Sequence, residues 1–162
     1  FIVKLDFYVY EQVFKFIRKS IDNNEPVVPI SVNVSRNHDK PEKFVHDFMS
    51  LLKKYNIPPA LIEVELLERA ALDKNLLRDI TLMLQKEGFR VAMDDFGSGE
   101  SSLNMLSTIP VNILKFDRSF LFANDAINGT LDSTSESFIE TLVVLGKNLK
   151  KETILRQTGK KP

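Results

Sequence analysis

Short β-branched segments alternate with amphipathic segments along this chain, and this alternation limits its fold more than any other feature of the sequence. Strands are predicted over residues 27–35, 61–67, 89–94, 111–116 and 152–155. Where apolar residues recur at helical spacing, helices are predicted over about 6–22, 41–55, 76–84, 102–106 and 133–149. Regular strand-then-helix order predicts a parallel sheet with crossover helices, which is an α/β fold.

Local signals place the ends of several helices. Pro41 suits the first turn of its helix, with Asp39 as the N-cap residue, and Gly88 suits the position just after a helix ends. Ser133 and Glu136 have the spacing of a capping box. These residues support the predicted alternation independently of the apolar spacing.

Composition narrows the class of protein. The 162 residues include 22 basic and 22 acidic side chains and no cysteine. The length suits one domain with a hydrophobic core, and the balanced charge argues against a protein held on DNA or RNA by bulk electrostatics. Without cysteine there are no disulfides and no thiolate zinc sites, which fits a reducing compartment. Because the sequence shows neither a signal peptide nor an apolar run near the ~18 residues that span a bilayer, we expect a cytoplasmic location.

Polar residues near the carboxyl ends of successive predicted strands indicate which kind of α/β fold this is. No Gly-rich turn of the Rossmann type follows the first strand, and no Walker-type phosphate loop occurs in the sequence. Active sites of TIM barrels are assembled at the carboxyl ends of the strands. The pattern therefore favours a site at that edge of a barrel-like sheet.

The first two predicted strands carry polar residues on one face. Because side chains alternate between faces, Asn33 lies opposite its valine neighbours, and Glu63 and Glu65 share a face. Two carboxylates on a central strand are costly to bury unless they are paired or bind a metal. An edge strand with a solvated outer face explains the first pattern equally well, and a solvent-facing surface explains the second.

The third and fourth predicted strands also end in charged residues. Asp94 and Asp95 precede a turn at 97–99, and adjacent carboxylates commonly hold Mg²⁺ or Mn²⁺, which prefer oxygen ligands. A turn with aspartate hydrogen bonds is the alternative. Lys115 lies between two bulky apolar neighbours, where it is either a functional cation or a snorkelling lysine.

These residues form one set for each strand-helix unit. Asn33, Glu65, Asp94, Asp95 and Lys115 supply one amide, three carboxylates and one ammonium group. That set offers enough oxygen for a pair of divalent ions, together with a cation for a phosphate or a water. It suits in-line hydrolysis of a phosphate ester. The two histidines of the chain lie outside this set.

At these positions the chain resembles the EAL-domain cyclic-di-GMP phosphodiesterases, bacterial second-messenger hydrolases built on a TIM-like barrel. The matching segments are 31–35 (S-V-N-V-S), 63–68 (E-V-E-L-L-E), 94–99 (D-D-F-G-S-G) and 115–120 (K-F-D-R-S-F). Their order and separations fit the family over roughly residues 5–155. The resemblance implies a TIM-type (β/α) barrel, of which 162 residues supply only about five of the eight parallel strands.

The resemblance also implies a role for each matching residue. Four residues correspond to metal ligands in a two-metal site for Mg²⁺ or Mn²⁺, the last of them for the second ion: Asn33, Glu65, Asp94 and Asp95. Lys115 corresponds to the catalytic lysine near the attacking water. Glu68 corresponds to the glutamate that braces the loop after the paired aspartates.

The sequence departs from the family pattern at several places. The Glu-Ala-Leu signature, whose Glu is a metal ligand, belongs to a strand expected before Phe1, and Gln157 stands where another ligand Glu is expected, in an atypical tail at 156–162. Leu67 replaces the usual Thr, and Glu100 replaces the usual Tyr. Because fewer carboxylates bind a divalent ion more weakly, we expect an incomplete metal site and an inactive isolated chain.

We therefore interpret residues 1–162 as a single, partial EAL domain of a bacterial signalling protein that hydrolyses cyclic-di-GMP to the linear dinucleotide. The expected partners are cyclic-di-GMP, a GGDEF or sensor domain of a parent protein that a membrane can tether, and a second copy that covers open sheet edges in a homodimer. No DNA or RNA partner is expected. The alternatives are a degenerate EAL module that binds cyclic-di-GMP or a protein partner without catalysis, and a barrel fragment without function.

Overall fold

Five parallel strands form one sheet in the order β1-β2-β3-β4-β5, which is also their order in the sequence. The structure is a computed structural model of the chain, and it describes residues 1–35, 38, 40–67, 74–96, 102–116 and 133–155. The strands are β1 (Ile30–Val34), β2 (Ile62–Leu67), β3 (Arg90–Phe96), β4 (Ile113–Phe116) and β5 (Glu152–Leu155). The α/β class predicted from the alternation is confirmed.

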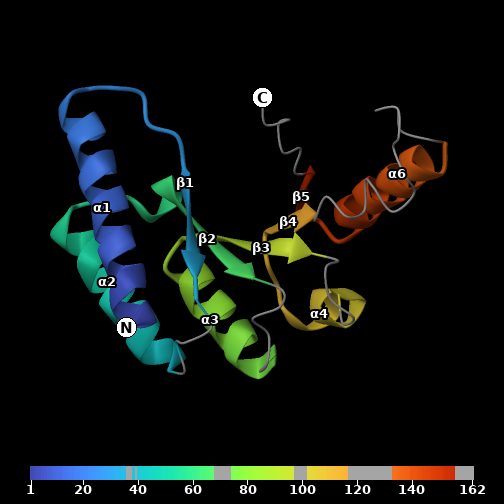
Figure 1. Cartoon of the computed structure of the whole chain (residues 1–162), viewed down its shortest axis with the longest axis horizontal. Coiled ribbons are helices and arrows are strands. Elements are labelled where there is room, and N and C mark those ends of the chain that lie inside the picture. The colour runs from blue at the N-terminus through green and yellow to red at the C-terminus, as the bar shows by residue number, and fades with distance from the viewer. Residues whose placement is uncertain (36–37, 39, 68–73, 97–101, 117–132, 156–162) are drawn as a thin grey trace.

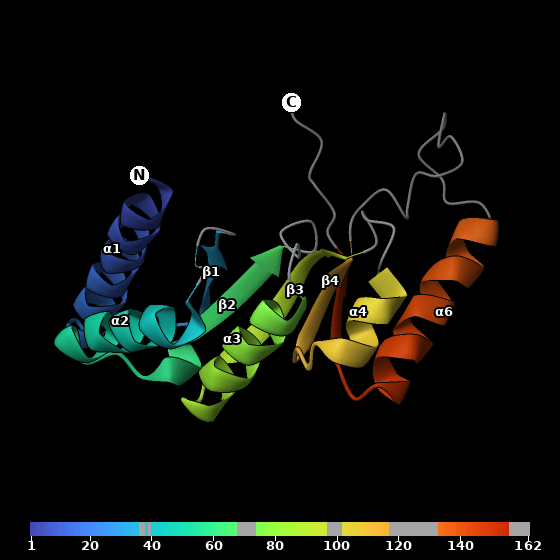
Figure 2. The same cartoon turned by 90° about the horizontal axis from the view of Figure 1, so that it is seen from below.

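The helices lie along one face of the sheet, from α1 and α2 near β1 to α6 near β5 (Figure 1 and Figure 2). They are α1 (Ile2–Asp22), α2 (Pro41–Lys54), α3 (Lys74–Lys86), α4 (Ser102–Thr108) and α6 (Ser133–Asn148), with a short 3₁₀ helix η1 (Pro59–Leu61) before β2. Within the described part of the chain, none of these helices combines the length and apolar composition needed to cross a membrane.

Element boundaries follow from local chemistry. β1 begins at Ile30 rather than at the predicted Val27, because Pro29 has no N–H to donate to a strand ladder. Gly88 follows α3 with φ of +93°, the left-handed conformation predicted for a residue that ends a helix. β5 covers the predicted residues. The predicted N-cap Asp39 lies outside the described residues.

The core lies between the sheet and the helices and is rich in aromatic rings. Phe48 of α2 is fully buried and contacts the rings of Tyr10, Phe14, Phe44 and Phe89 at centroid distances of 4.9 to 5.6 Å. Aromatic pairs of this kind contribute about 0.5–1.5 kcal/mol each beyond the area they bury. They join α1 and α2 to each other and to Phe89, which directly precedes β3.

The two faces of the sheet differ in polarity as the period-two pattern predicts. On β1, Val32 and Val34 are buried, whereas Ser31 and Asn33 are exposed. The β1–β2 register aligns Ser31 with Glu63, so the polar residues of both strands lie on the face away from the helices. This polar face carries the candidate site.

Candidate active site

Strand pairing places several predicted site residues near one another at the carboxyl edge of the sheet. Asn33 of β1 is in register with Glu65 of β2, and Leu67 of β2 is in register with Asp94 of β3. Glu65 and Asp94 are 3% and 2% exposed, whereas Asn33 is exposed. Nearly inaccessible carboxylates are costly in a protein interior unless a cation accompanies them.

Lys115 of β4 supplies a cation at this edge. Its Nζ forms an ion pair with Oε1 of Glu65 and lies 2.6 Å from Oε1 of Glu63, both on β2. It also donates a hydrogen bond of 3.2 Å to Oγ of Ser31 on β1. β3 lies between β2 and β4, and its residue in register with Glu65 is the small, fully buried Ala92. The lysine therefore reaches across a strand whose nearest side chain leaves room for it.

The charge state of Lys115 follows from two opposing effects. Burial lowers the pKa of its ammonium group, but the hydrogen bonds to Glu63 and Glu65 outweigh burial and raise the pKa above its usual value. The side chain is consequently a fixed cation at neutral pH. It can hold a hydrogen-bond acceptor, such as a water oxygen, or an anion in place, but it cannot serve as a general base there.

The paired aspartates lie at an irregular point in β3. Asp95 has φ of +52°, and the β3–β4 register shifts between Met93 and Phe96. Aspartate tolerates the left-handed conformation better than most residues, because its short side chain bonds locally. The backbone of β3 therefore departs from strict alternation at the paired aspartates, and their joint role in one site stays a prediction.

The residue types at this edge fit a hard divalent cation. The amide of Asn33 and the carboxylates of Glu65, Asp94 and Asp95 offer only oxygen donors, and two of these carboxylates are buried. Among the described residues, however, no three His, Asp or Glu side chains lie close enough to hold one ion. Glu65 is engaged by Lys115 instead. A metal bound here therefore has to share Glu65 with the lysine or take it over.

Helix α1 fixes the end of β1 where Asn33 lies. The buried hydroxyl of Tyr10 donates a 2.9 Å hydrogen bond to the backbone oxygen of Asn33. Two residues after Asn33, Oγ of Ser35 donates a 2.5 Å hydrogen bond to Oδ2 of Asp6. Burial and the nearby Asp6 carboxylate raise the pKa of Tyr10, so its hydroxyl keeps its proton. The helix thus positions a candidate ligand from the opposite side of the sheet.

His38 belongs to the same anchor. Its Nε2 lies 2.9 Å from Oδ2 of Asp6, and its ring packs on Phe44 with centroids 4.4 Å apart. Both histidines were predicted to lie outside the site, and His46 is an exposed residue of α2. Neither Asp6 nor His38 has a local signal for this contact, because it joins residues far apart in sequence.

Several predicted site residues lie outside the part of the chain that the structure describes. Glu68 lies outside the described residues, as do the turn at 97–99, Glu100 and Gln157. Their roles stay predictions. Sequence reasoning also assigned no role to Glu63, although it placed this residue on the same face as Glu65.

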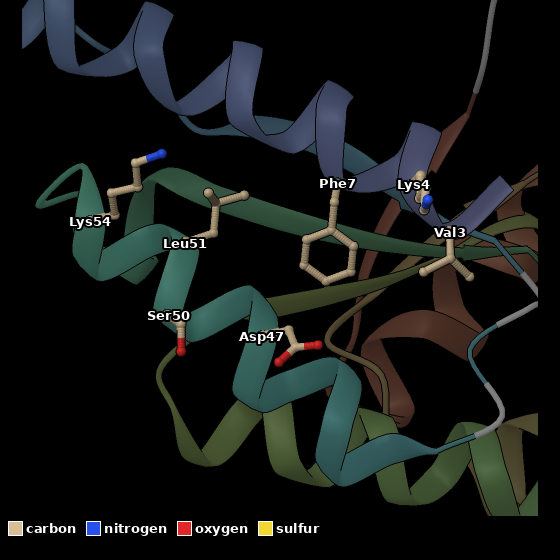
Figure 3. A pocket seen from close by; sticks show the side chains of 7 residues that line it. All are labelled: Val3, Lys4, Phe7, Asp47, Ser50, Leu51 and Lys54. Carbon is tan, nitrogen blue, oxygen red and sulfur yellow. The ribbon is translucent and has the colours of Figure 1, made fainter. Parts of the chain in front are cut away.

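A separate cavity of about 470 Å³ lies between α1 and α2. Phe7 and Val3 of α1 and Leu51 of α2 form its apolar lining (Figure 3). Lys54, at one end of it, already forms an ion pair with Glu11. Of the candidate catalytic and metal-binding residues that the structure describes, none lines this cavity.

The family model for the EAL domain matches residues 1–157. The chain belongs to the EAL domain family. The resemblance seen in the four sequence motifs is thereby confirmed.

Individual bacterial proteins match most of the chain. Signaling protein YkoW of Bacillus subtilis is 31% identical over 126 residues, which are 77% of this chain and 15% of YkoW. Cyclic di-GMP phosphodiesterase PdeA of Borreliella burgdorferi is 30% identical over 122 residues, which are 75% of this chain and 18% of PdeA. The chain thus spans less than a fifth of either curated relative.

A solved EAL structure supports the barrel assignment. The MucR phosphodiesterase of Pseudomonas aeruginosa, in complex with cyclic-di-GMP, is 24% identical and superposes with a TM-score of 0.79. The match covers 99% of this chain and 68% of that one. The five parallel strands are therefore part of a TIM-type barrel, as predicted.

Proposed function

We propose that this chain is part of a cyclic-di-GMP phosphodiesterase domain, which hydrolyses the cyclic dinucleotide to the linear one. In this reaction the oxygen of a water forms a bond to phosphorus, and the bond from phosphorus to one ribose oxygen breaks. Membership in the EAL family supports the substrate class. The proposal extends to divalent-metal dependence and to the roles of individual residues.

The observation that carries this proposal is the position of Lys115. Its ammonium group is held by Glu63, Glu65 and Ser31 on the polar face, near the carboxyl edge where Asn33 and Asp94 also lie. A fixed cation among carboxylates can orient a water and offset negative charge that grows on a phosphate in the transition state. Such a group lowers the barrier without first having to reorganise.

The candidate ligands for Mg²⁺ or Mn²⁺ are Asn33, Glu65, Asp94 and Asp95. A divalent ion at such a site supplies Lewis-acid chemistry toward a phosphate ester. Asn33 is positioned by the hydrogen bond from Tyr10, and Glu65 by its place in a central strand. Glu68 is proposed to brace the segment after the aspartates.

One observation favours a second function, binding of cyclic-di-GMP without hydrolysis. Glu65 pairs with Lys115, and no three acidic or histidine side chains of the described residues are within reach of one ion. Glu100 and the tail at 156–162 also depart from the pattern that the resemblance implies, as does Leu67. A degenerate EAL module with these properties would keep the nucleotide surface and lose the chemistry.

Hydrolysis by a longer product of the same gene, including residues upstream of Phe1, separates the two functions. We expect it to form the linear dinucleotide with Mg²⁺ or Mn²⁺, detected by chromatography, and to lose this activity when a chelator is added. Asp94→Asn should abolish turnover, whereas Asp47→Asn, an aspartate of α2 outside the site, should not. Binding without turnover in the unsubstituted protein would select the binding module, and the absence of binding would exclude both.

The proposed cellular context follows from the family. We propose a cytoplasmic domain, joined in its parent protein to a GGDEF or sensor domain, that acts on cyclic-di-GMP as part of a homodimer. The first supporting observation is that the chain spans only 15% and 18% of two curated relatives. The second is that, among the described residues, the edge strands β1 and β5 each pair with one neighbouring strand.

A further inference from the structure

Glu63 is a nearly buried carboxylate to which the proposed chemistry gives no role. It lies on β2 two residues before Glu65, and its side chain is 12% exposed. Its Oε1 accepts a 2.9 Å hydrogen bond from Oγ of Ser31 and lies 2.6 Å from Nζ of Lys115. A carboxylate in this environment is held by specific partners rather than by solvent.

Ser31, Glu63 and Lys115 form a closed set of contacts. Besides its bond to Glu63, Oγ of Ser31 accepts a hydrogen bond of 3.2 Å from Nζ of Lys115. The three residues lie on β1, β2 and β4, and the β1–β2 register aligns Ser31 with Glu63. Because strands rather than loops carry all three side chains, their relative positions are set by the sheet.

The two glutamates that hold Lys115 differ in what else they can do. Glu65 aligns with the candidate ligand Asn33, whereas Glu63 aligns with Ser31, further from the carboxyl edge. If Glu65 were to hold a divalent ion, its carboxylate oxygens would no longer be available to Lys115, and the added positive charge would repel the ammonium group. With Glu65 as its sole anionic partner, the lysine would leave the site whenever the ion binds.

We propose that Glu63 and Ser31 are positioning residues that retain the Lys115 ammonium group in the site while Glu65 binds a divalent cation. This inference rests on the proposed function, because it takes Glu65 as a metal ligand. Glu63 supplies the remaining negative charge, and Ser31 orients its carboxylate and accepts a hydrogen bond from the ammonium group. The lysine therefore changes partners without leaving the site.

The first experiment needs no metal and uses the ¹⁵N-labelled 162-residue chain. The ammonium signal of Lys115 is identified by its loss in Lys115→Arg, and its proton exchange is compared among variants. Glu65→Gln imitates the neutralised ligand, so the signal should persist in that variant and disappear in Glu63→Gln/Glu65→Gln. Glu152→Gln removes an exposed glutamate that pairs with Arg90, and this control should leave the signal unchanged.

Backbone ¹H–¹⁵N spectra report whether each variant folds. If the double variant does not fold, Ser31→Ala/Glu65→Gln replaces it and should exchange its ammonium protons faster than Glu65→Gln. Persistence of the Lys115 signal in either folded double variant, at the exchange rate of Glu65→Gln, would overturn the proposal. Loss of the signal in Glu65→Gln alone would overturn it as well, because Glu63 would then be insufficient.

Titration with Mg²⁺ tests the linkage to the proposed function. Saturating Mg²⁺ should preserve the Lys115 signal in the unsubstituted chain and remove it in Glu63→Gln. A signal that survives in Mg²⁺-saturated Glu63→Gln contradicts the positioning role. If Mg²⁺ changes no spectrum, metal binding by this chain is rejected, and the metal-free comparison still decides whether Glu63 holds the lysine.

Discussion

The hydroxyl of Tyr10 in α1 donates a 2.9 Å hydrogen bond to the backbone oxygen of Asn33 in β1. A helix on one face of the sheet thus holds a residue whose side chain belongs to the candidate site on the opposite face. Both the tyrosine ring and the adjacent Val34 are buried. The contact joins the core to the candidate site directly. Substitutions in the core are therefore expected to affect Asn33.

Removing this hydroxyl should destabilise the chain. We expect Tyr10→Phe to lower the free energy of unfolding by about 0.5–1.5 kcal/mol, because the carbonyl of Asn33 loses its donor while the ring still packs. Urea unfolding measures the loss. Tyr8→Phe is the matched control, because Tyr8 is an exposed tyrosine of the same helix. Equal stability of Tyr10→Phe and the unsubstituted chain would show that the bond contributes nothing.

A second prediction concerns acid stability. Hydrogen bonds from Lys54 and Tyr55 lower the pKa of Glu11 from 4.5 to about 2, and they connect α1 to the end of α2. Because the folded pKa is the lower one, this contribution to stability is complete above pH 4.5 and is lost as the pH falls toward 2. Glu11→Gln should therefore reduce the fall in the urea midpoint across that interval.

Glu42→Gln, an exposed glutamate of α2, is the control for this experiment. Its midpoints should follow those of the unsubstituted chain over the same pH interval. A Glu11→Gln variant whose midpoints fall just as steeply would reject the linkage.

A third prediction tests how α6 packs on β5. Gly146 is a helix residue, and an alanine in a helix is ordinarily more favourable than glycine by about 1 kcal/mol. A Cβ at this position, however, would lie 2.1 Å from Cγ2 of Thr153. Since overpacking costs about 1–3 kcal/mol, Gly146→Ala should be destabilising on balance.

Thr153→Ser removes the methyl group responsible for the clash and so provides the test. The remaining contacts of the new Cβ are at 3.5 Å, an ordinary separation. We expect Gly146→Ala/Thr153→Ser to be more stable in urea than Gly146→Ala alone, with Thr153→Ser measured separately. If the unfolding free energy of the double variant changes by the sum of the changes in the two single variants, the clash is relieved in another way.

Local patterns predict the order of elements well, because each strand and helix is encoded by its own spacing of apolar residues. They predict the first and last residue of an element less well, because some boundaries are not marked by a start or stop residue. α1 begins at Ile2 rather than near Asp6, since no residue in the first turn stops a helix. The strand near Val27 is shortened because Pro29 cannot donate to the ladder.

The sequence predicts on which face of its strand each candidate site residue lies, but not which side chains contact one another. Period-two alternation places Glu63 and Glu65 on one face and Lys115 on the same face of a later strand. It does not reveal that the lysine crosses β3 to reach β2, which depends on strand order and on the small Ala92 between them. The link from Asp6 to His38 depends on tertiary packing alone, so the sequence carries no signal for it.

The isolated 162-residue chain is expected not to hydrolyse cyclic-di-GMP with Mg²⁺ or Mn²⁺. Its sequence contains no Glu-Ala-Leu, and Gln157 stands where the family has a ligand Glu. Each missing carboxylate weakens a divalent site. Chromatography of the products gives the answer: linear dinucleotide that increases with the amount of chain and disappears with chelator would prove this expectation wrong.

The last prediction concerns the lysine in a longer protein that contains these 162 residues together with a Glu-Ala-Leu segment. There Lys115→Ala should reduce kcat by about 10²–10³-fold while the nucleotide Kd changes little, because a fixed cation acts most strongly on charge that develops in the transition state. Asp95→Asn should lower turnover and also weaken the dependence on metal, since it removes a ligand oxygen. Lys43→Ala, which removes an exposed lysine of α2, is the control and should leave both quantities unchanged. If Lys115→Ala instead weakens binding at an unchanged kcat, the lysine only holds a phosphate, and nucleotide binding without catalysis becomes the better description of this edge of the sheet.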